Sequence, residues 1–121
     1  PINVLSTHSP WLMGSLTMGC KGLLSGSGSI IADLHVAMWQ AVQNQDLAQA
    51  QEINARIYPT AQCFYGEPSG DMHNRMKEAV VRPPLAKLSD AELANIKAAI
   101  DAAGLTRDGA FAGTPARQAA E

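Results

Sequence analysis

The stretch LSTHSPWLMGSLTMGCKGLLSGSGSII, Leu5 to Ile31, decides the fold of this 121-residue chain. Two short apolar runs, Ile2–Leu5 and Gly22–Ser25, each lead into a cluster of small hydroxyl and glycine residues. The first run contains β-branched residues and the second is too brief for a helix, so both predict strands. A flexible linker would account for the glycines but not for the apolar runs. A binding site built at strand ends accounts for both.

The segment between the two runs is predicted to be a short helix. Ser9 precedes Pro10, which is a capping residue followed by a first-turn proline, and Leu12 and Leu16 follow at helical spacing. Gly19 is the expected C-terminal stop. A strand, a crossover helix and a second strand imply parallel pairing. The polar tips of both strands are therefore expected at the same edge of a sheet.

Beyond Ile31 the spacing of apolar residues changes to that of helices. A first helix is expected to end near Asn44, with one face formed by Ile31, Leu34, His35, Met38 and Val42. Asp46, with Gln49 three residues later, resembles a capping box that opens a second helix. Pro59 lies within that helix and predicts a kink rather than a break. Its apolar stripe consists of Leu47, Ala50, Ile53, Ile57, Ala61 and Phe64.

The C-terminal third predicts two further helices. One spans Asp71–Ala79 and is followed by an extended segment, Val80–Leu85, in which two prolines disfavour helix. The last starts at Ser89, with Glu92 completing a capping box, and stops at Gly104. Leu88 is expected to staple onto Leu93. The remainder, 106–121, is small and polar and predicts a disordered tail.

Composition indicates one compact domain and excludes several partners. Hydrophobic residues make up 46% of the chain, and nine basic residues face eleven acidic ones, for a net charge of -2. Near balance without a basic stripe predicts no nucleic-acid or membrane partner, and no apolar run approaches the ~20 residues that a membrane span needs. Cys20 and Cys63 are expected to be reduced and buried, which favours the cytoplasm.

Three stretches together resemble the C-terminal part of the dihydrodipicolinate synthase and N-acetylneuraminate lyase family, and its sugar-acid dehydratases in particular. The stretch NVLSTHSPWLMGSLTMGCKGLLSGSGSII is similar to the family's last two barrel strands with the helix between them. LAQAQEINARIYP resembles its first appended helix, and VRPPLAKLSDAELANIKAAIDAAGL resembles its closing segment. The match covers about 2–105, and the order of these motifs carries it, because none is diagnostic alone.

The resemblance implies an α/β fold, the C-terminal portion of a (β/α)8 TIM barrel plus a helical extension, mostly helical as an isolated chain. Residues 1–44 would be the last two βα units, 45–105 the extension and 106–121 the tail. It also implies a homo-oligomer, usually a tetramer, and a reaction through a Schiff-base lysine on a 2-keto acid, without metal or cofactor. The catalytic lysine and tyrosine belong to strands outside this chain, so the chain is expected to hold no catalytic residue and to be inactive alone.

Two departures from the family pattern bear on the substrate. Ser6-Thr7-His8-Ser9 stands where the synthases have Ser-Gly-Asp-Asp, and the loss of both acids argues against the lysine-biosynthesis reaction. About ten residues that the family has between Met76–Glu78 and Val81–Pro83 are missing here.

In such a barrel, residues at the C-terminal ends of the strands line the site. The expected substrate-binding residues are Ser6, Thr7, His8, Ser25, Gly26 and Ser27. Small hydroxyls there can bind a polyhydroxylated acid, and glycines let it approach the backbone. The alternative is that all six are ordinary turn residues.

Other readings of single residues stay open or are set aside. His8 could bind substrate or transfer a proton, or be an exposed turn residue. His35 is expected to be a satisfied core histidine. The glycine-serine run lacks the lysine and spacing of a P-loop. Lys21 precedes its strand and so lies at the wrong end for an imine lysine. The spacing of histidines and cysteines predicts no metal site.

Two different classes of function remain. The first is part of a Schiff-base lyase, a dehydratase or an aldolase of the same family. The second is a non-catalytic, mostly helical interaction module that binds through exposed strand edges at Ile2–Leu5 and Gly22–Ser25. The amino-terminal Pro1 also invites comparison with tautomerases, but the second βα half of such a subunit is missing.

Overall fold

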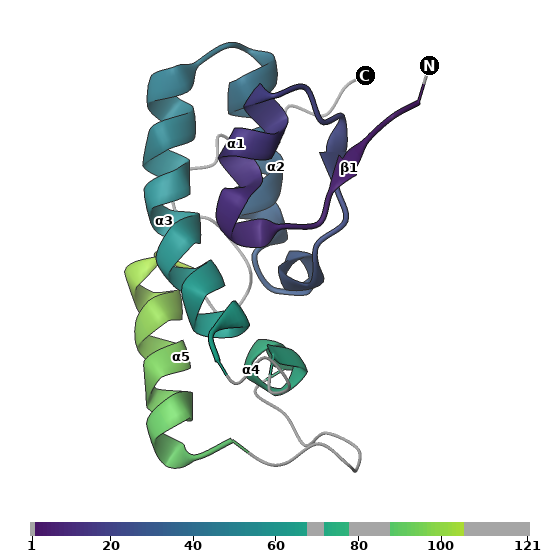
Figure 1. Ribbon diagram of the computed structural model, residues 1–121. Helices are drawn as coiled ribbons and strands as arrows, with labels where there is room; N and C mark the ends of the chain where they lie inside the picture. Colours follow the sequence, from purple (N-terminus) through teal and green to yellow (C-terminus); the bar gives the residue numbers. More distant parts are fainter. Residues whose placement is uncertain (1, 68–71, 78–87, 106–121) are drawn as a thin grey trace, which may run out of the picture.

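A computed structural model describes residues 2–67, 72–77 and 88–105 of the chain. Within these ranges, two short strands and five α-helices follow one another, with two 3-10 turns between them. Figure 1 shows the strand pair on one side, α1 and α2 in the middle, and the long α3 on the other side. α5 packs along the lower half of α3, and α4 lies near the end of α3. The protein is therefore mostly helical, with a small sheet at one margin.

The strands pair in parallel, as the strand–helix–strand order predicts. β1 (Leu5–Ser6) and β2 (Gly22–Leu23) are in register, with Leu5 opposite Gly22 and Ser6 opposite Leu23. Two further hydrogen bonds extend the ladder, from the Lys21 amide to the Val4 carbonyl and from the Leu24 amide to the Ser6 carbonyl. Both strands are shorter than expected: β1 begins at Leu5 rather than at Ile2, and β2 ends at Leu23 rather than at Ser25.

The crossover consists of a 3-10 turn, η1 (Ser9–Trp11), that runs into α1 (Leu12–Thr17). The stop at Gly19 is confirmed, since its φ of 103° is a left-handed conformation that glycine adopts without strain. The predicted cap at Ser9 is wrong. His8 occupies the cap position without a side-chain hydrogen bond, and the Ser9 hydroxyl turns inward to other partners.

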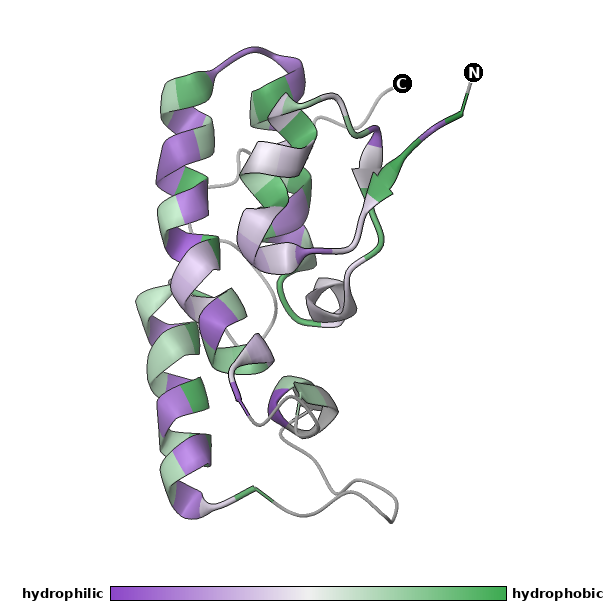
Figure 2. Ribbon diagram, in the orientation of Figure 1, coloured by the Kyte–Doolittle hydropathy of each residue, from purple (hydrophilic) through white to green (hydrophobic). Residues whose placement is uncertain are grey.

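A second 3-10 turn, η2 (Gly26–Ser29), leads into α2 (Ala32–Gln43), which packs against α3 (Leu47–Tyr65). The Asp46 carboxylate accepts a hydrogen bond from the Gln49 amide at 3.0 Å, as predicted, and α3 continues through Pro59 without a break. Figure 2 shows hydrophilic and hydrophobic residues alternating along α3. Its predicted stripe is buried except for Leu47, the first residue of α3, which is exposed. The main core consists of Leu12, Leu16, Ile31, Leu34, Met38, Ala41, Ala50, Ile53, Ile57, Ala61 and Ala103.

A second, smaller core joins α3, α4 (Met72–Lys77) and α5 (Asp90–Ala102) around Phe64, Met76 and Ile96. The capping box of α5 is confirmed: the Glu92 amide donates to the Ser89 hydroxyl, and the Glu92 carboxylate accepts from the Ser89 amide. Leu88 packs into this second core, whereas Leu93 is exposed. The predicted staple between them is not the contact that Leu88 makes.

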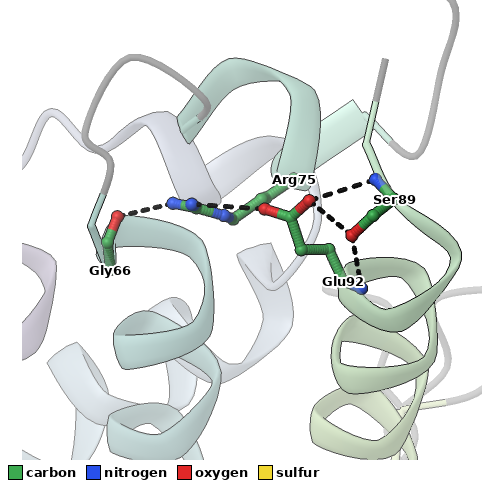
Figure 3. Close-up of polar contacts among 4 residues, drawn as sticks. All are labelled: Gly66, Arg75, Ser89 and Glu92. Carbon is green, nitrogen blue, oxygen red and sulfur yellow. Dashed lines mark hydrogen bonds and ion pairs between the residues drawn. The ribbon is translucent and has the colours of Figure 1, made fainter. Parts of the chain in front are cut away.

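Arg75 of α4 links these elements. Its guanidinium donates to the Gly66 carbonyl just beyond α3, and it lies 3.5 Å from the Glu92 carboxylate at the start of α5 (Figure 3). The Arg75 side chain is almost entirely buried, and Glu92 is about one-third exposed. The predicted extended segment 80–85, the missing loop before it and the tail 106–121 lie outside the described residues.

Candidate functional site

Four side-chain hydroxyls meet where β1 and β2 end. We call Ser9, Ser25, Ser27 and Tyr65 the hydroxyl cluster. Ser9 follows β1 in η1, and Ser25 and Ser27 follow β2 at the start of η2. Tyr65 is the last residue of α3, 56 positions from Ser9. Parallel pairing brings the two strand ends to one edge, and the packing of α3 on η1 brings the phenol there.

The cluster is continuous, with Ser9 and Ser27 buried and Ser25 and Tyr65 partly buried. The Ser9 and Ser25 hydroxyls share a short hydrogen bond, and the Ser25 and Ser27 hydroxyls lie 2.8 Å apart. Ser9 donates to the Tyr65 oxygen at 3.1 Å, and the Ser27 amide donates to the same oxygen at 3.2 Å. Ser9 and Ser27 are almost wholly inaccessible, so their hydroxyls need protein partners. Each of them finds partners within the cluster.

The hydrogen bonds to Tyr65 change the acidity of its phenol. Burial alone would raise its pKa, but the hydroxyls of Ser9, Ser25 and Ser27 and the Ser27 amide together hold the pKa below its ordinary value. Donors that point at an oxygen stabilise its ionised form, which is the cause of the net shift.

His35 of α2 borders the cluster. Its Nε2 lies 3.5 Å from the Ser27 hydroxyl, at the outer limit of a hydrogen bond, and its ring is buried. Burial lowers the pKa of His35, so the neutral ring is favoured near neutral pH. The prediction of a satisfied core histidine agrees with this placement.

The six predicted binding residues do not all come together. The structure brings Ser25 and Ser27 into the cluster, and Gly26 lies beside them, where an added Cβ would be 3.4 Å from the Tyr65 oxygen. Ser6 is buried but bonds Ser15 of α1 at 2.9 Å. Thr7 and His8 are exposed to solvent. A role for the six in substrate binding stays a prediction.

Sequence reasoning missed two members of the cluster. Ser9 was interpreted as a helix cap, because a serine before a proline has that local pattern. Tyr65 belongs to no local motif that marks it as a site residue. Its spacing contained a usable signal, since Ile57, Ala61 and Tyr65 recur every four residues and so share one face of α3.

An open groove of about 430 Å³ runs along β2, η2 and α2 beside the cluster. The indole nitrogen of Trp39 donates to the Lys21 carbonyl at its rim, and the exposed apolar side chains of Leu24 and Val36 also line it. Ser25 and His35 contribute polar groups to the same lining. The complete lining is Gly22, Leu23, Leu24, Ser25, Gly28, Ala32, His35, Val36 and Trp39.

The described residues offer no gathered metal ligands: no group of three or more histidine, cysteine or acidic side chains lies close enough to hold an ion. Cys20 and Cys63 are free and only partly buried, so the expectation of full burial was wrong for both. Lys21 is exposed at the beginning of β2, away from the hydroxyl cluster at its end. Within the described ranges, no helix is both long and apolar enough to span a bilayer.

The fold of this chain is similar to that of several solved dihydrodipicolinate synthases. The dihydrodipicolinate synthase of Oceanobacillus iheyensis matches 81% of this chain with a TM-score of 0.72 and 16% identity. The Bacillus clausii synthase matches 80% with a TM-score of 0.71 and 22% identity, and the Bacillus anthracis synthase 81% with 0.70 and 19%. The fold is a fragment of that TIM barrel.

The match covers only a part of each synthase. This chain spans 36% of the length of each of the three. No protein-family model matches the sequence, and no curated protein matches it either. At such low identity the likeness establishes the fold, and it confirms the expectation of a barrel portion with a helical extension.

Proposed function

We propose that this chain is the C-terminal part of a Schiff-base lyase that dehydrates a 2-keto-3-deoxy sugar acid. We take 2-keto-3-deoxy-L-arabonate, giving 2-oxoglutarate semialdehyde, as the proposed substrate, because within the family the motifs suggest a likeness to 2-keto-3-deoxy-L-arabonate dehydratase. The observation that carries the proposal is the match of 80% or more of the chain to one part of the synthase barrel.

The chemistry would be divided between this chain and the rest of the barrel. A lysine amine condenses with the keto group and releases water, and the protonated imine then acts as an electron sink. Loss of a proton from the adjacent carbon and departure of the β-hydroxyl release a second water and leave a carbon–carbon double bond. Loss of a proton from the terminal carbinol carbon and protonation of the carbon next to the imine turn the terminal alcohol into the aldehyde, and hydrolysis of the imine consumes one water and frees the product. The lysine and the catalytic tyrosine would both come from strands outside this chain, which would contribute substrate-binding groups only.

The placement of the hydroxyls supports this role. Active sites of TIM barrels lie at the C-terminal ends of the strands, and β1 and β2 end beside the hydroxyl cluster and the groove. Serine hydroxyls suit a ligand rich in hydroxyl groups. The two acids that the synthases have after the first of these strands are replaced here by His8 and Ser9. This favours a sugar acid over the synthase's own substrates. An aldolase of the same family would use the same groups.

The assembly and location follow from the same proposal. We propose a homo-oligomer, as is usual in the family, acting in the cytoplasm on a small 2-keto acid. We also propose residues 1–44 as the last two βα units and 45–105 as the extension. The open groove along β2 and the exposed apolar residues of β1 suit contact with further strands and helices of a barrel.

Intact mass and borohydride trapping test the proposal. Mass spectrometry of the native material should give a chain near three hundred residues, matching the relative lengths of the solved synthases. Borohydride with pyruvate or with a 2-keto-3-deoxy acid should then add the reduced ligand to one lysine outside the present sequence. The isolated 121-residue chain is the control and should form no adduct. An adduct on Lys21 or Lys97 of the isolated chain, or none on the long chain, would contradict the proposal.

A second candidate, a non-catalytic interaction module, is favoured by the exposed apolar residues near β1 and β2. Ile2 is 92% exposed and Leu24 is 69% exposed, and a free sheet edge is a template for pairing. If the native mass equals that of 121 residues and the chain is recovered in a stable complex with a different protein, this second function replaces the first.

A further inference from the structure

We infer that Tyr65 is a positioning residue, whose phenol oxygen holds Ser9, Ser25 and Ser27 in one hydrogen-bonded chain and fixes the direction in which their hydroxyl protons point. This inference rests on the proposed function only where it assigns Ser25 a role in binding the ligand. The phenol comes from the helical extension, so a residue outside the strands would set the hydroxyl groups at their ends.

The direction follows from counting protons. The Ser27 amide can only donate, so the Tyr65 oxygen is an acceptor at 3.2 Å. Ser9 also donates to it, at 3.1 Å, and a hydroxyl has one proton. Ser25 must therefore be the donor in its short hydrogen bond with Ser9.

The same count of protons applies to the contact between Ser25 and Ser27. Ser25 has given its proton to Ser9, so the single proton of the Ser27 hydroxyl is donated to Ser25 at 2.8 Å or to Ser9 at 3.3 Å. With either acceptor, the hydroxyl protons point along the chain toward Tyr65. Such chains strengthen cooperatively, because each donated proton makes the donor oxygen a better acceptor.

This order has a consequence for recognition. Ser25 lines the groove, and with its proton committed it has only lone-pair capacity left for a ligand. It can accept a hydrogen bond from a hydroxyl group but has no proton for a carboxylate. Ser25 would therefore select the hydroxyl end of a sugar acid rather than its acid end.

Phenylalanine at position 65 removes the oxygen that terminates the chain. The Ser27 amide, which is buried, then loses its acceptor, and the Ser9 proton is free to turn to Ser25. Tyr58→Phe is the matched control, because Tyr58 lies on the same helix, is exposed, and has Gln62 as its hydrogen-bond partner.

Phenol titration by absorbance in the 121-residue chain is the first test, since the chain has two tyrosines. In the Tyr58→Phe protein Tyr65 alone ionises, and its midpoint should lie below that of free tyrosine. Adding Ser9→Ala to Tyr58→Phe should raise this midpoint by removing one donor. A midpoint at or above that of free tyrosine, or one that Ser9→Ala leaves in place, would overturn the inference even if Tyr65→Phe failed to fold.

Amide hydrogen exchange is the second test. Exchange of the Ser27 amide should accelerate about tenfold or more in Tyr65→Phe and stay at the wild-type rate in Tyr58→Phe. Equal Ser27 exchange in the two variants would contradict the role given to the phenol.

Ligand selection is tested in the long chain by comparing borohydride trapping of pyruvate, which has no hydroxyl group, with that of a 2-keto-3-deoxy acid. Tyr65→Phe should reduce trapping of the hydroxylated acid relative to pyruvate, and unchanged relative trapping would refute the selection by Ser25. If the wild-type protein traps neither, the proposed function fails, whereas the titration and exchange results still decide the role of Tyr65.

Discussion

At the scale of the residue, Ser9 shows how a single hydroxyl connects distant segments. Its oxygen contacts Ser25 and Tyr65, and the residue is buried. We expect Ser9→Ala to lower the free energy of unfolding by about 1–2 kcal/mol, because Ser25 and Tyr65 both lose a buried hydrogen-bond partner. Urea denaturation followed by circular dichroism measures this loss.

Ser29→Ala is the control for that substitution. Ser29 is an exposed serine of η2 that bonds the Gly26 carbonyl within its own turn, so its removal should cost less than about 0.5 kcal/mol. Equal costs for the two variants would mean that the long-range contacts of Ser9 contribute nothing to stability.

The separation in sequence between partners explains what could be predicted at this scale. Asp46 and Ser89 were correctly predicted as caps because each bonds a residue three positions away, so the whole motif is visible in the sequence. Ser9, in contrast, bonds Ser25 and Tyr65, which lie 16 and 56 positions away in the sequence. A serine before a proline has the local pattern of a helix cap. The hydrogen bond between Ser9 and Tyr65 arises only from the packing of α3 on η1.

At the scale of the element, Arg75 holds three helices together. The side chain of Arg75 is almost entirely buried. Its guanidinium donates a hydrogen bond to the Gly66 carbonyl at the end of α3 and pairs with the Glu92 carboxylate of α5 (Figure 3). We expect Arg75→Met, which keeps the length of the side chain, to cost about 1–3 kcal/mol through loss of the charge-assisted hydrogen bond. The pair with Glu92 contributes little of this, because Glu92 is partly in solvent.

Lys97→Met is the control for Arg75, since Lys97 is an exposed cation of α5. Its urea midpoint should stay close to that of the wild type. A wild-type midpoint for Arg75→Met as well would show that α4 docks without its arginine.

The start of α5 predicts a dependence of stability on pH. Hydrogen bonds from the Ser89 amide and hydroxyl, and then the charge of Arg75, lower the pKa of Glu92. A carboxyl whose pKa is depressed in the folded state stabilises the fold above its unfolded pKa of about 4.3 and loses that contribution as pH falls through the folded value. The advantage of the wild type over Glu92→Gln should therefore shrink between about pH 5 and pH 3.

Urea midpoints of both proteins at several pH values in that window measure this effect. A constant difference between the wild type and Glu92→Gln across the window would show that the carboxylate makes no charge-dependent contribution to the folded state.

The elements themselves were predictable to different degrees. The helices were found close to their observed ends because the apolar spacing of α2, α3 and α5 extends over three or more turns. The strands were overextended, since β1 has only two paired residues and periodicity carries no information at that length. The direction of pairing was nevertheless correct, because the length of the crossover constrains it.

At the scale of the whole molecule, the surface is that of a part of a larger fold. Fold neighbours are more than twice as long as this chain, and an apolar groove lies open along β2 and α2. Neither property could be read from composition, because 46% hydrophobic residues suits a complete small domain equally well. What the sequence did reveal was the order of its motifs, which placed the two strands at the end of a barrel.

The groove gives the last prediction. In the isolated 121-residue chain, Leu24→Lys should reduce the emission of a bound apolar dye by about half or more, because Leu24 lines the groove where the dye would sit. Leu47→Lys is matched to it, since Leu47 is a similarly exposed leucine at the start of α3 and away from the groove. Equal reductions would mean that the dye does not use the groove.

In a long chain that completes the barrel, further strands and helices would cover the groove, so the difference between the two variants should vanish and Leu24→Lys should instead destabilise the protein. The same pair of leucines thus distinguishes a surface exposed by the missing part of a barrel from a surface that is open in the native protein.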